Sequence, residues 1–268
     1  MLAPTRRAFL PWDCFGRIRP QSSCIPDPRS RKPAMSERFF IEHPPTAAEV
    51  TFDEAESQHL AKVMRANAGD IVIGFDGRGI EYQIELTTVG KKKVVGTVRN
   101  QAEVSREAAR HLTLAVALPK GDRQRWLVEK CVELGVARLI PLLTKRGVAQ
   151  PVEKAIERLR RAVIEASKQC ERNHLMVVEE GQSLAELLVS RPAASFLLHP
   201  SGETIHHDAI LPASEVLAII GPEGGFTDEE VAAAAEHGCQ VVSLGPRILR
   251  VETAALAMAT LVTALPRP

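Results

Sequence analysis

Short apolar runs of strand length divide the first part of the chain, and glycine-containing turns connect most of them. The runs occupy residues 38–41, 71–75, 80–86 and 94–98. Between the first two, residues 53–66 place Leu60, Val63 and Met64 on one face of a predicted helix. Short strands at this spacing predict a small, mostly β domain of barrel type over residues 35–105.

Strand and helix patterns alternate through the remaining residues, 106–268. The predicted strands are 111–118, 136–143, 196–198, which ends at His199, 216–220 and 241–244. Helices follow them, with Asp122 as an expected N-cap and Pro151 as the first residue of another helix. This alternation predicts an α/β domain built on a parallel sheet. The polar residues 101–110 are the expected linker.

Two segments near the C-terminus repeat one design, an apolar strand followed by a glycine loop and a helix. The first loop is Gly221–Phe226 and the second is Gly245–Arg250. We expect the two strands to be neighbours, and open α/β sheets bind ligands at the carboxyl ends of their strands, so the loops form the predicted ligand site. Thr227 and Glu230 have the spacing of a capping box and are expected to cap the helix rather than contact a ligand.

The ligand is not expected to be a nucleoside triphosphate or a dinucleotide. The chain contains neither G-x-x-x-x-G-K-[ST] nor G-x-G-x-x-G. Asp228, Glu229 and Glu230 also fill the helix N-terminus, where a phosphate would otherwise bind. Leu249, an apolar residue in a loop that should be polar, favours a flat apolar ligand such as adenine or contact with another subunit.

Composition indicates the cellular compartment and sets the first 34 residues apart from the rest of the chain. The 268 residues include no apolar run long enough to cross a membrane, and the five cysteines show neither a C-x-x-C pair nor metal spacing. We therefore expect structural thiols, no metal and a cytoplasmic setting. Residues 1–34 hold seven basic and two acidic side chains, which leaves 27 basic and 31 acidic ones, a net charge of −4, in the rest. A disordered tail or a start codon assigned too far upstream, with Met35 as the true start, is favoured over a transit peptide.

A longer pattern spans both loops. Gly221–Phe226 followed by Leu244–Ala254 resembles the paired motif of the RsmE family, bacterial 16S ribosomal RNA (uracil-N3)-methyltransferases of the SPOUT superfamily. Further matches are Phe75-Asp76-Gly77, Lys120-Gly121-Asp122, Glu133–Val136 and His199-Pro200. The resemblance covers residues 38–265 and leaves out the first 34.

The resemblance implies a fold, a cofactor and partners. The N-terminal domain would be a PUA-like RNA-binding β-barrel, and the C-terminal domain would have a SPOUT-type parallel sheet with a C-terminal trefoil knot. Family members are homodimers that bind S-adenosyl-L-methionine in the knot loops and act on 16S rRNA of the small ribosomal subunit. Carried over to this chain, the cofactor contacts are Leu198, Gly221, Glu223, Gly225, Leu244, Gly245, Ile248, Leu249 and Thr253.

Methyl transfer to N3 of uracil requires a protein that aligns the base, removes the N3 proton and excludes water. Arg172 is the first candidate and Arg250 the second for stabilising the charge that spreads onto O2 and O4. Glu223 and Glu252 are candidate proton acceptors, with solvent as the alternative. Phosphate groups of the RNA are expected to meet Arg38, Arg65, Lys120 and Arg146.

Two other functions stay open at this point. One is a SPOUT ribose 2′-O-methyltransferase acting on RNA, against which the barrel and the motif around Leu249 argue. The other is a non-catalytic RNA-binding factor in ribosome assembly, against which the two intact glycine loops argue.

Overall fold

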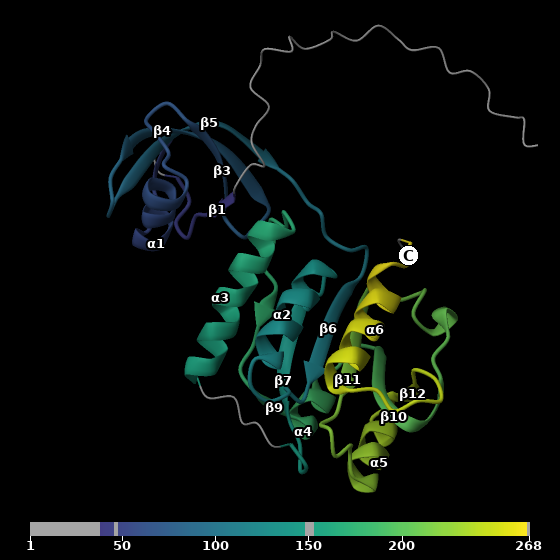
Figure 1. The fold of residues 1–268 in the computed structure, drawn as a ribbon. Coiled ribbons are helices and arrows are strands. Elements are labelled where there is room, and N and C mark those ends of the chain that lie inside the picture. Colours follow the sequence, from purple (N-terminus) through teal and green to yellow (C-terminus); the bar gives the residue numbers. More distant parts are fainter. Residues whose placement is uncertain (1–37, 46–47, 148–152, 267–268) are drawn as a thin grey trace, which may run out of the picture. The chain divides into compact units, whose positions relative to one another are not determined.

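The computed structural model describes residues 38–45, 48–147 and 153–266 (Figure 1). The predictions for the extension 1–34, for Met35 and for Pro151 lie outside these residues. Within them, no helix is long and apolar enough to cross a membrane.

The N-terminal part is a curled five-stranded mixed sheet. Its strand order is β1 (Arg38–Phe40), β3 (Ile71–Phe75), β4 (Ile80–Val89), β5 (Val94–Glu103) and β2 (Glu49–Thr51). The β1–β3 pair is parallel and the other pairs are antiparallel. The predicted β domain is therefore present, but β2 was not expected, and β5 runs into the segment predicted as linker because its residues 100–103 still pair with β4.

One helical segment covers this sheet, and it is less regular than its sequence pattern suggests. Helix α1 (Glu54–Gln58) begins at Asp53, whose carboxylate accepts a hydrogen bond from the backbone N–H of Glu56 at 2.7 Å. It continues as a π-helical turn, η1 (His59–Val63). Leu60 is fully buried under the sheet, whereas Val63 and Met64, predicted on the same face, are exposed.

The C-terminal part is a parallel sheet with strand order β12 (Gln240–Ser243), β10 (Ala194–Thr204), β11 (Glu215–Ile220), β6 (His111–Val116), β7 (Arg138–Leu143) and β8 (Val177–Val178). The short strand β9 (Gln182–Ser183) also pairs with β7. The connecting helices are α2 (Arg123–Glu133), α3 (Glu153–Gln169), α4 (Leu184–Val189), α5 (Asp228–Glu236) and α6 (Val251–Thr263), with a 3-10 turn, η2 (His207–Ala209). The predicted α/β domain is confirmed.

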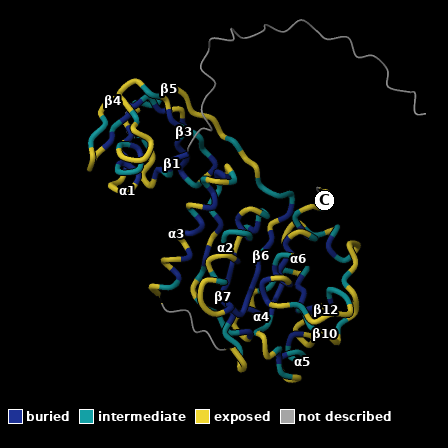
Figure 2. The backbone as a smooth tube through the Cα atoms, in the orientation of Figure 1, coloured by how far each residue is buried: buried dark blue, intermediate teal, exposed yellow. Residues whose placement is uncertain are grey.

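Helices cover both faces of the parallel sheet, which explains the continuous apolar strands. In β11, Val216, Ala218 and Ile220 pack into one hydrophobic cluster with α2, α3 and α6, whereas Leu217 and Ile219 pack into a second cluster with α4 and α5. Because side chains alternate between the faces of a strand, a strand buried on both sides must be apolar at every position. Figure 2 shows these central strands as buried along most of their length.

Three details of the C-terminal domain differ from the predictions. Strands β11 and β12 are not neighbours, because β10 lies between them. Strand β10 does not end at His199 but continues to Thr204, since after a register shift Glu203 and Thr204 again pair with β12. Asp122 precedes α2, yet its side chain makes no capping hydrogen bond. The trefoil knot and the exact domain boundaries at residues 34/35 and 105/106 stay predictions.

Candidate functional site

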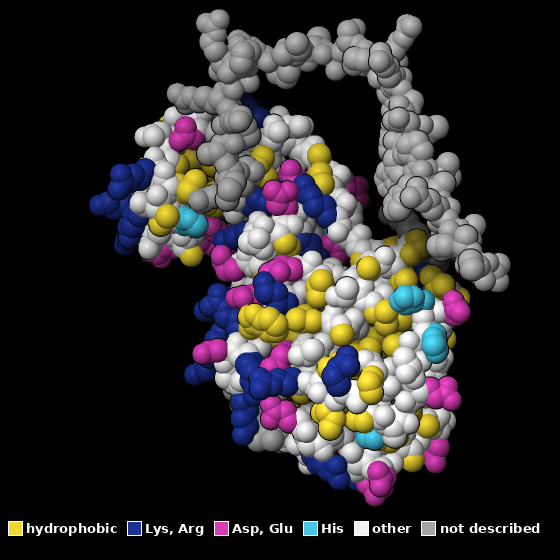
Figure 3. Space-filling model, turned by 45° about the vertical axis from the view of Figure 1, so that its right-hand side comes forward, with side chains coloured by type: hydrophobic (Ala, Val, Ile, Leu, Met, Phe, Trp, Pro, Cys, Tyr) yellow, Lys and Arg dark blue, Asp and Glu magenta, His cyan; other side chains and the backbone are white. Residues whose placement is uncertain are grey.

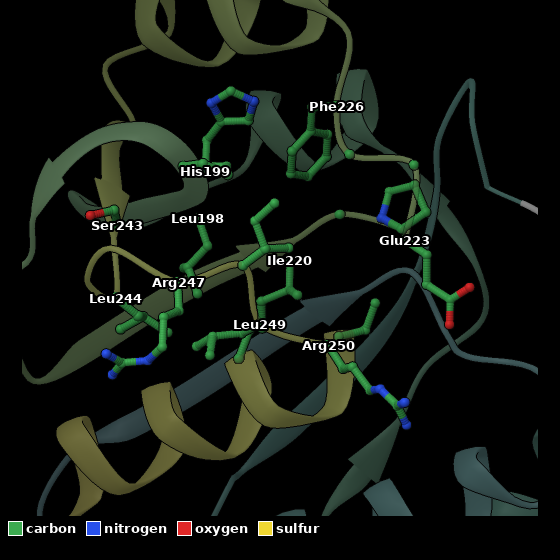
Figure 4. Close-up of a pocket in the computed structure, with 18 of the residues that line it drawn as sticks. Leu198, His199, Ile220, Glu223, Phe226, Ser243, Leu244, Arg247, Leu249 and Arg250 are labelled. Atoms are coloured by element: carbon green, nitrogen blue, oxygen red, sulfur yellow. The ribbon is translucent and has the colours of Figure 1, made fainter.

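A cavity of 520 Å³ opens at the carboxyl ends of β10, β11 and β12, within the roughly 300–1,000 Å³ typical of small-molecule sites. Three segments form most of it: residues 198–200 of β10, residues 220–226 at and after the end of β11, and residues 242–251 from β12 to the start of α6, with Arg146 and Ala254 completing the lining. Figure 4 shows Leu198, Ile220 and Leu249 together at its centre, with the rings of His199 and Phe226 across from them. The two predicted loops therefore face one cavity, although an extra strand separates the strands that carry them.

Glycine residues shape the first loop, which packs against the ring of Phe226. Gly225 has φ +70°, and its N–H donates to the carbonyl of Pro222 at 2.8 Å, which closes a tight turn. A Cβ on Gly221 would meet the buried ring of Phe226 at 2.8 Å, so the aromatic ring can lie here only against glycine. This turn leaves backbone groups, rather than side chains, along this wall of the cavity.

The helix after this loop is capped by its own residues. The Thr227 hydroxyl accepts from the N–H of Glu230, and the Glu230 carboxylate accepts from the N–H of Thr227 at 2.8 Å. The capping box predicted from the sequence is confirmed. Glu230 also accepts from the backbone N–H of Lys145 at 3.1 Å, which ties α5 to the segment after β7.

Arg146 lies on the cavity wall and braces the glycine loop. Its Nη1 donates to the carbonyls of Gly224 at 3.0 Å and Phe226 at 3.3 Å. Arg146 was predicted to bind RNA. In this structure, part of its hydrogen-bonding capacity serves the loop, while its side chain remains exposed.

The second loop presents an apolar residue to solvent, but not the one expected. Ile248 is 90% exposed, whereas Leu249 is half-buried and packs against the large core cluster. Gly245, with φ +105°, turns the chain out of β12. Arg247 and Arg250 also line the cavity, and Figure 4 shows their guanidinium groups pointing away from its centre.

Eight of the nine predicted cofactor residues line the cavity. They are Leu198, Gly221, Glu223, Gly225, Leu244, Gly245, Ile248 and Leu249. Thr253 is not among the lining residues, because it lies one turn into α6 and its side chain is exposed elsewhere. His199 and Phe226 line the cavity without having been assigned a role. The His199-Pro200 match was the sequence signal that pointed to the first of them.

The structure does not bring Arg172, the first catalytic candidate, to the cavity. Arg172 is 4% exposed, and its Nε and Nη2 contact the two carboxylate oxygens of Glu107 at 2.8 and 2.5 Å. Its Nη1 donates to the carbonyl of Val136 at 2.8 Å. Each of its three guanidinium nitrogens is hydrogen-bonded to backbone or to Glu107, away from the cavity, and its catalytic role stays a prediction.

The predicted RNA-binding residues differ in their exposure to solvent. Arg38 is buried, its Nη1 contacts the Glu81 carboxylate at 2.8 Å, and its guanidinium lies 5.4 Å from the centre of the Phe75 ring. It holds the N-terminal sheet together and does not offer its charge to a ligand. Arg65 and Lys120 are exposed.

Two carboxylates and one arginine meet beside the cavity. Arg123 Nη1 lies 3.0 Å from Glu223 Oε1 and 3.4 Å from Glu252 Oε1. The hydrogen bond that Arg123 donates to Glu223 raises the pKa of Arg123, so the guanidinium stays charged. Glu223 lines the cavity, and Glu252, at the first turn of α6, does not. The sequence predicts Glu223 and Glu252 as site residues, but it does not assign Arg123, which joins them, to the site.

Both parts of the chain match known protein families. Residues 106–263 match the family model of the RNA methyltransferase domain, and residues 52–99 match that of the RNA methyltransferase PUA domain. The ribosomal RNA small subunit methyltransferase E of Synechocystis sp. is 36% identical over 217 residues, 77% of this chain and 70% of that protein. The protein of the same name from Bacillus subtilis is 34% identical over 230 residues, 81% of this chain and 89% of its own length.

A solved structure shares the same architecture. The ribosomal RNA small subunit methyltransferase E from Neisseria gonorrhoeae, bound to S-adenosyl methionine, matches with a TM-score of 0.77 and 29% identity over 84% of this chain and 95% of that one. The predicted PUA-like sheet followed by a SPOUT-type parallel sheet is thus confirmed. With both domains and the greater part of their length in common, this chain belongs to the RNA methyltransferase family that includes the ribosomal RNA small subunit methyltransferases E.

Proposed function

We propose that this protein methylates N3 of a uridine in the 16S rRNA of the small ribosomal subunit, with S-adenosyl-L-methionine as the methyl donor. The observation that carries the proposal is the cavity at the two glycine loops, in a chain whose relatives are named for small-subunit rRNA methylation and one of which binds S-adenosyl methionine.

The residues of the cavity fit this cofactor. Leu198, Ile220 and Leu249 offer an apolar surface for a flat ring, and the loop around Gly221 and Gly225 offers backbone groups for hydrogen bonds. The capped N-terminus of α5 has its anion position filled, which disfavours a triphosphate. When bound, S-adenosyl-L-methionine supplies an electrophilic methyl group on a sulfonium.

The chain's own residues must handle the base and its proton. Arg250 lines the cavity and is the candidate for stabilising the charge that develops on O2 or O4 of uracil, for which its guanidinium, which points away from the centre (Figure 4), must turn inward. Glu223 lines the cavity and is joined through Arg123 to Glu252, and either carboxylate is a candidate to accept the N3 proton. Since N3 lies on the pairing edge of the base, the target uridine must be unpaired or turned out of a helix.

RNA contacts are assigned to exposed basic residues. Arg65, Lys120 and Arg146 remain the candidates, since Arg38 is buried. On the face drawn in Figure 3, Lys and Arg side chains form several groups with Asp and Glu between them. Grouped cations suit phosphate contacts even though the body of the chain carries no excess positive charge.

We infer a homodimer that works in the cytoplasm, where small subunits are assembled. The 90% exposure of Ile248 beside the cavity supports the dimer, because an apolar side chain in this loop is better placed against a second copy than in water. Sedimentation equilibrium of the wild type and of Ile248→Glu would test this, and two monomeric samples would contradict it.

Transfer of tritium from labelled S-adenosyl-L-methionine to small subunits that lack the modification tests the function. We expect label in 3-methyluridine after nucleoside digestion of the 16S rRNA. Label in a 2′-O-methylated nucleoside would keep the fold and refute the base chemistry. Absence of both label and cofactor binding by calorimetry, with a control enzyme active in parallel, would instead favour the non-catalytic binding factor.

Replacing Thr227 with alanine separates capping from ligand contact. Loss of an N-cap side chain costs about 1 kcal/mol, so we expect the Tm to fall by roughly 2–4 °C. The Kd for S-adenosyl-L-methionine should change less than about threefold, since the hydroxyl serves the helix. A tenfold weaker Kd with an unchanged Tm would show that Thr227 contacts the cofactor after all.

A further inference from the structure

A second, smaller cleft adjoins the large cavity. Its volume is 40 Å³, and its walls are the segment Ala117–Lys120 after β6 together with Pro222, Glu223 and Val251. The two walls come from neighbouring strands, since the N–H of Ala117 donates to the carbonyl of Ile220 at the end of β11 at 2.9 Å. Pro222, Glu223 and Val251 also line the large cavity, so the two spaces meet at Glu223.

The polar groups at and beside this cleft are charged, and one carboxylate oxygen among them has no hydrogen-bond donor in the described part of the chain. Arg123 joins Glu223 to Glu252 through a single nitrogen, Nη1. Glu252 is 8% exposed, and its Oε2 is buried with no hydrogen-bond partner among the described residues. A buried oxygen without a donor costs free energy, so the cluster is arranged to receive one further hydrogen-bond donor.

We propose that this cleft receives the Watson–Crick edge of the acceptor base, and that Lys120, Arg123 and the carboxylate pair of Glu223 and Glu252 select uracil there. The inference rests on the proposed function and deepens it by naming the acceptor subsite. The volume holds about three water molecules, which suits the edge of a planar ring while the rest of the nucleotide stays outside.

The charge pattern of the cleft matches uracil and not cytosine. The pairing edge of uracil presents an acceptor, a donor and an acceptor, at O4, N3–H and O2. Its complement is two cations and a carboxylate: Lys120 and Glu223 line the cleft, and Arg123, which is not a lining residue, contacts Glu223 at 3.0 Å. Cytosine presents a donor at N4 and a lone pair at N3, so its amino group would face a cation and its N3 lone pair a carboxylate.

The same groups can remove the N3 proton of uracil. The N3–H bond breaks, the proton passes to the Glu223 carboxylate, and the electron pair left on N3 forms the new bond to the methyl carbon. The electron pair of the methyl–sulfur bond stays on the sulfur of the donor. Negative charge on O2 and O4 before transfer is stabilised by Lys120 and Arg123.

One helix N-terminus reinforces this stabilisation. Helix α2 begins at Arg123, the preceding Asp122 makes no side-chain capping bond, and its first turn holds no acidic side chain. The first turn of α6 already holds Glu252, and α5 is capped by its own residues. The first-turn N–H groups of α2 therefore favour an anionic base.

Steady-state transfer assays with unmodified small subunits test the assignment on Arg123→Ala, Lys120→Ala and Ala117→Leu, the last of which fills the cleft. We expect kcat/KM for the RNA to fall at least about 100-fold in Arg123→Ala and Ala117→Leu, and about 10-fold in Lys120→Ala. The Kd for S-adenosyl-L-methionine should stay within about threefold of wild type. Arg125→Ala on the same helix is the matched control, because Arg125 is exposed and pairs with half-buried Glu129 at 2.7 Å, and it should act as wild type.

A specificity readout separates reading of the base from mere support of the fold. Once the labelled uridine is mapped, subunits carrying uridine or cytidine at that position are titrated against the wild type and Glu223→Gln, whose amide can donate to N3 of cytosine. We expect the ratio of the Kd for cytidine subunits to the Kd for uridine subunits to fall at least about tenfold in the variant.

The outcomes are distinct. Unchanged kcat/KM in Arg123→Ala and Lys120→Ala would refute the cleft as acceptor site, even if Ala117→Leu fails to fold. Parallel loss of cofactor binding would assign the cleft to the cofactor and refute it equally. A wild type that binds cofactor but labels no small-subunit RNA would overturn the proposed function, and the acceptor subsite with it.

Discussion

Replacing Arg172 with alanine is expected to destabilise the protein by about 3 kcal/mol, because it breaks a partly buried ion pair and leaves buried backbone carbonyls without a donor. Arg172 spans the Glu107 carboxylate and the carbonyl of Val136, so its loss leaves both without their donor. Urea unfolding monitored by circular dichroism measures the change. Arg172→Lys should recover less than half of it, since an ammonium cannot reproduce the two-pronged contact.

Arg158 on the exposed face of α3 supplies the control for this prediction. It is exposed, and its replacement by alanine should change the free energy of unfolding by less than about 0.5 kcal/mol. If Arg172→Ala kept wild-type stability and cofactor binding but lost methyl transfer, the residue would return to the catalytic role predicted from the sequence.

Replacing Gly221 with alanine is expected to weaken binding of S-adenosyl-L-methionine by about 10–100-fold, or roughly 1.4–2.7 kcal/mol. The added Cβ would lie 2.8–3.0 Å from three atoms of the Phe226 ring, which is 4% exposed and packed in the second core cluster. Since the ring cannot move outward freely, the loop must shift and deform the cavity wall. Isothermal titration calorimetry measures the effect.

Gly224 in the same loop is the matched control. A Cβ there would lie 3.5 Å from Cβ of Arg146, an ordinary contact. Gly224→Ala should therefore bind the cofactor within about threefold of wild type. Equal Kd values for the two variants would show that the Gly221–Phe226 contact does not shape the cavity.

Local patterns in the sequence predicted the parts of the site that neighbouring residues build. The capping box of Thr227 and Glu230 and the glycine turn at Gly225 involve groups within three residues of one another, so their geometry is written in local spacing. The apolar run at residues 216–220 likewise predicted a strand, which the structure shows as β11. Asp122 failed as a cap although it has the right type and place, because its backbone is already helical at φ −65° and ψ −17°.

Contacts between distant segments were beyond such reasoning. The order of β10 between β11 and β12, and the extension of β10 to Thr204, depend on which strands pair, and that is decided by packing of the whole sheet. Arg172 carries the same charge whether it contacts a ligand or Glu107, so its residue type alone could not assign it.

By itself, then, the sequence determined the class of fold, the two glycine loops and the family, because each follows from local periodicity or from a continuous motif. Only the tertiary structure decided that β10 lies between the strands that carry the two loops, that Arg172 contacts Glu107 and Arg38 contacts Glu81, and that Arg123 joins Glu223 to Glu252. The reason is physical: these contacts link side chains 43 to 129 positions apart, and the chain brings such residues together only when its core is packed.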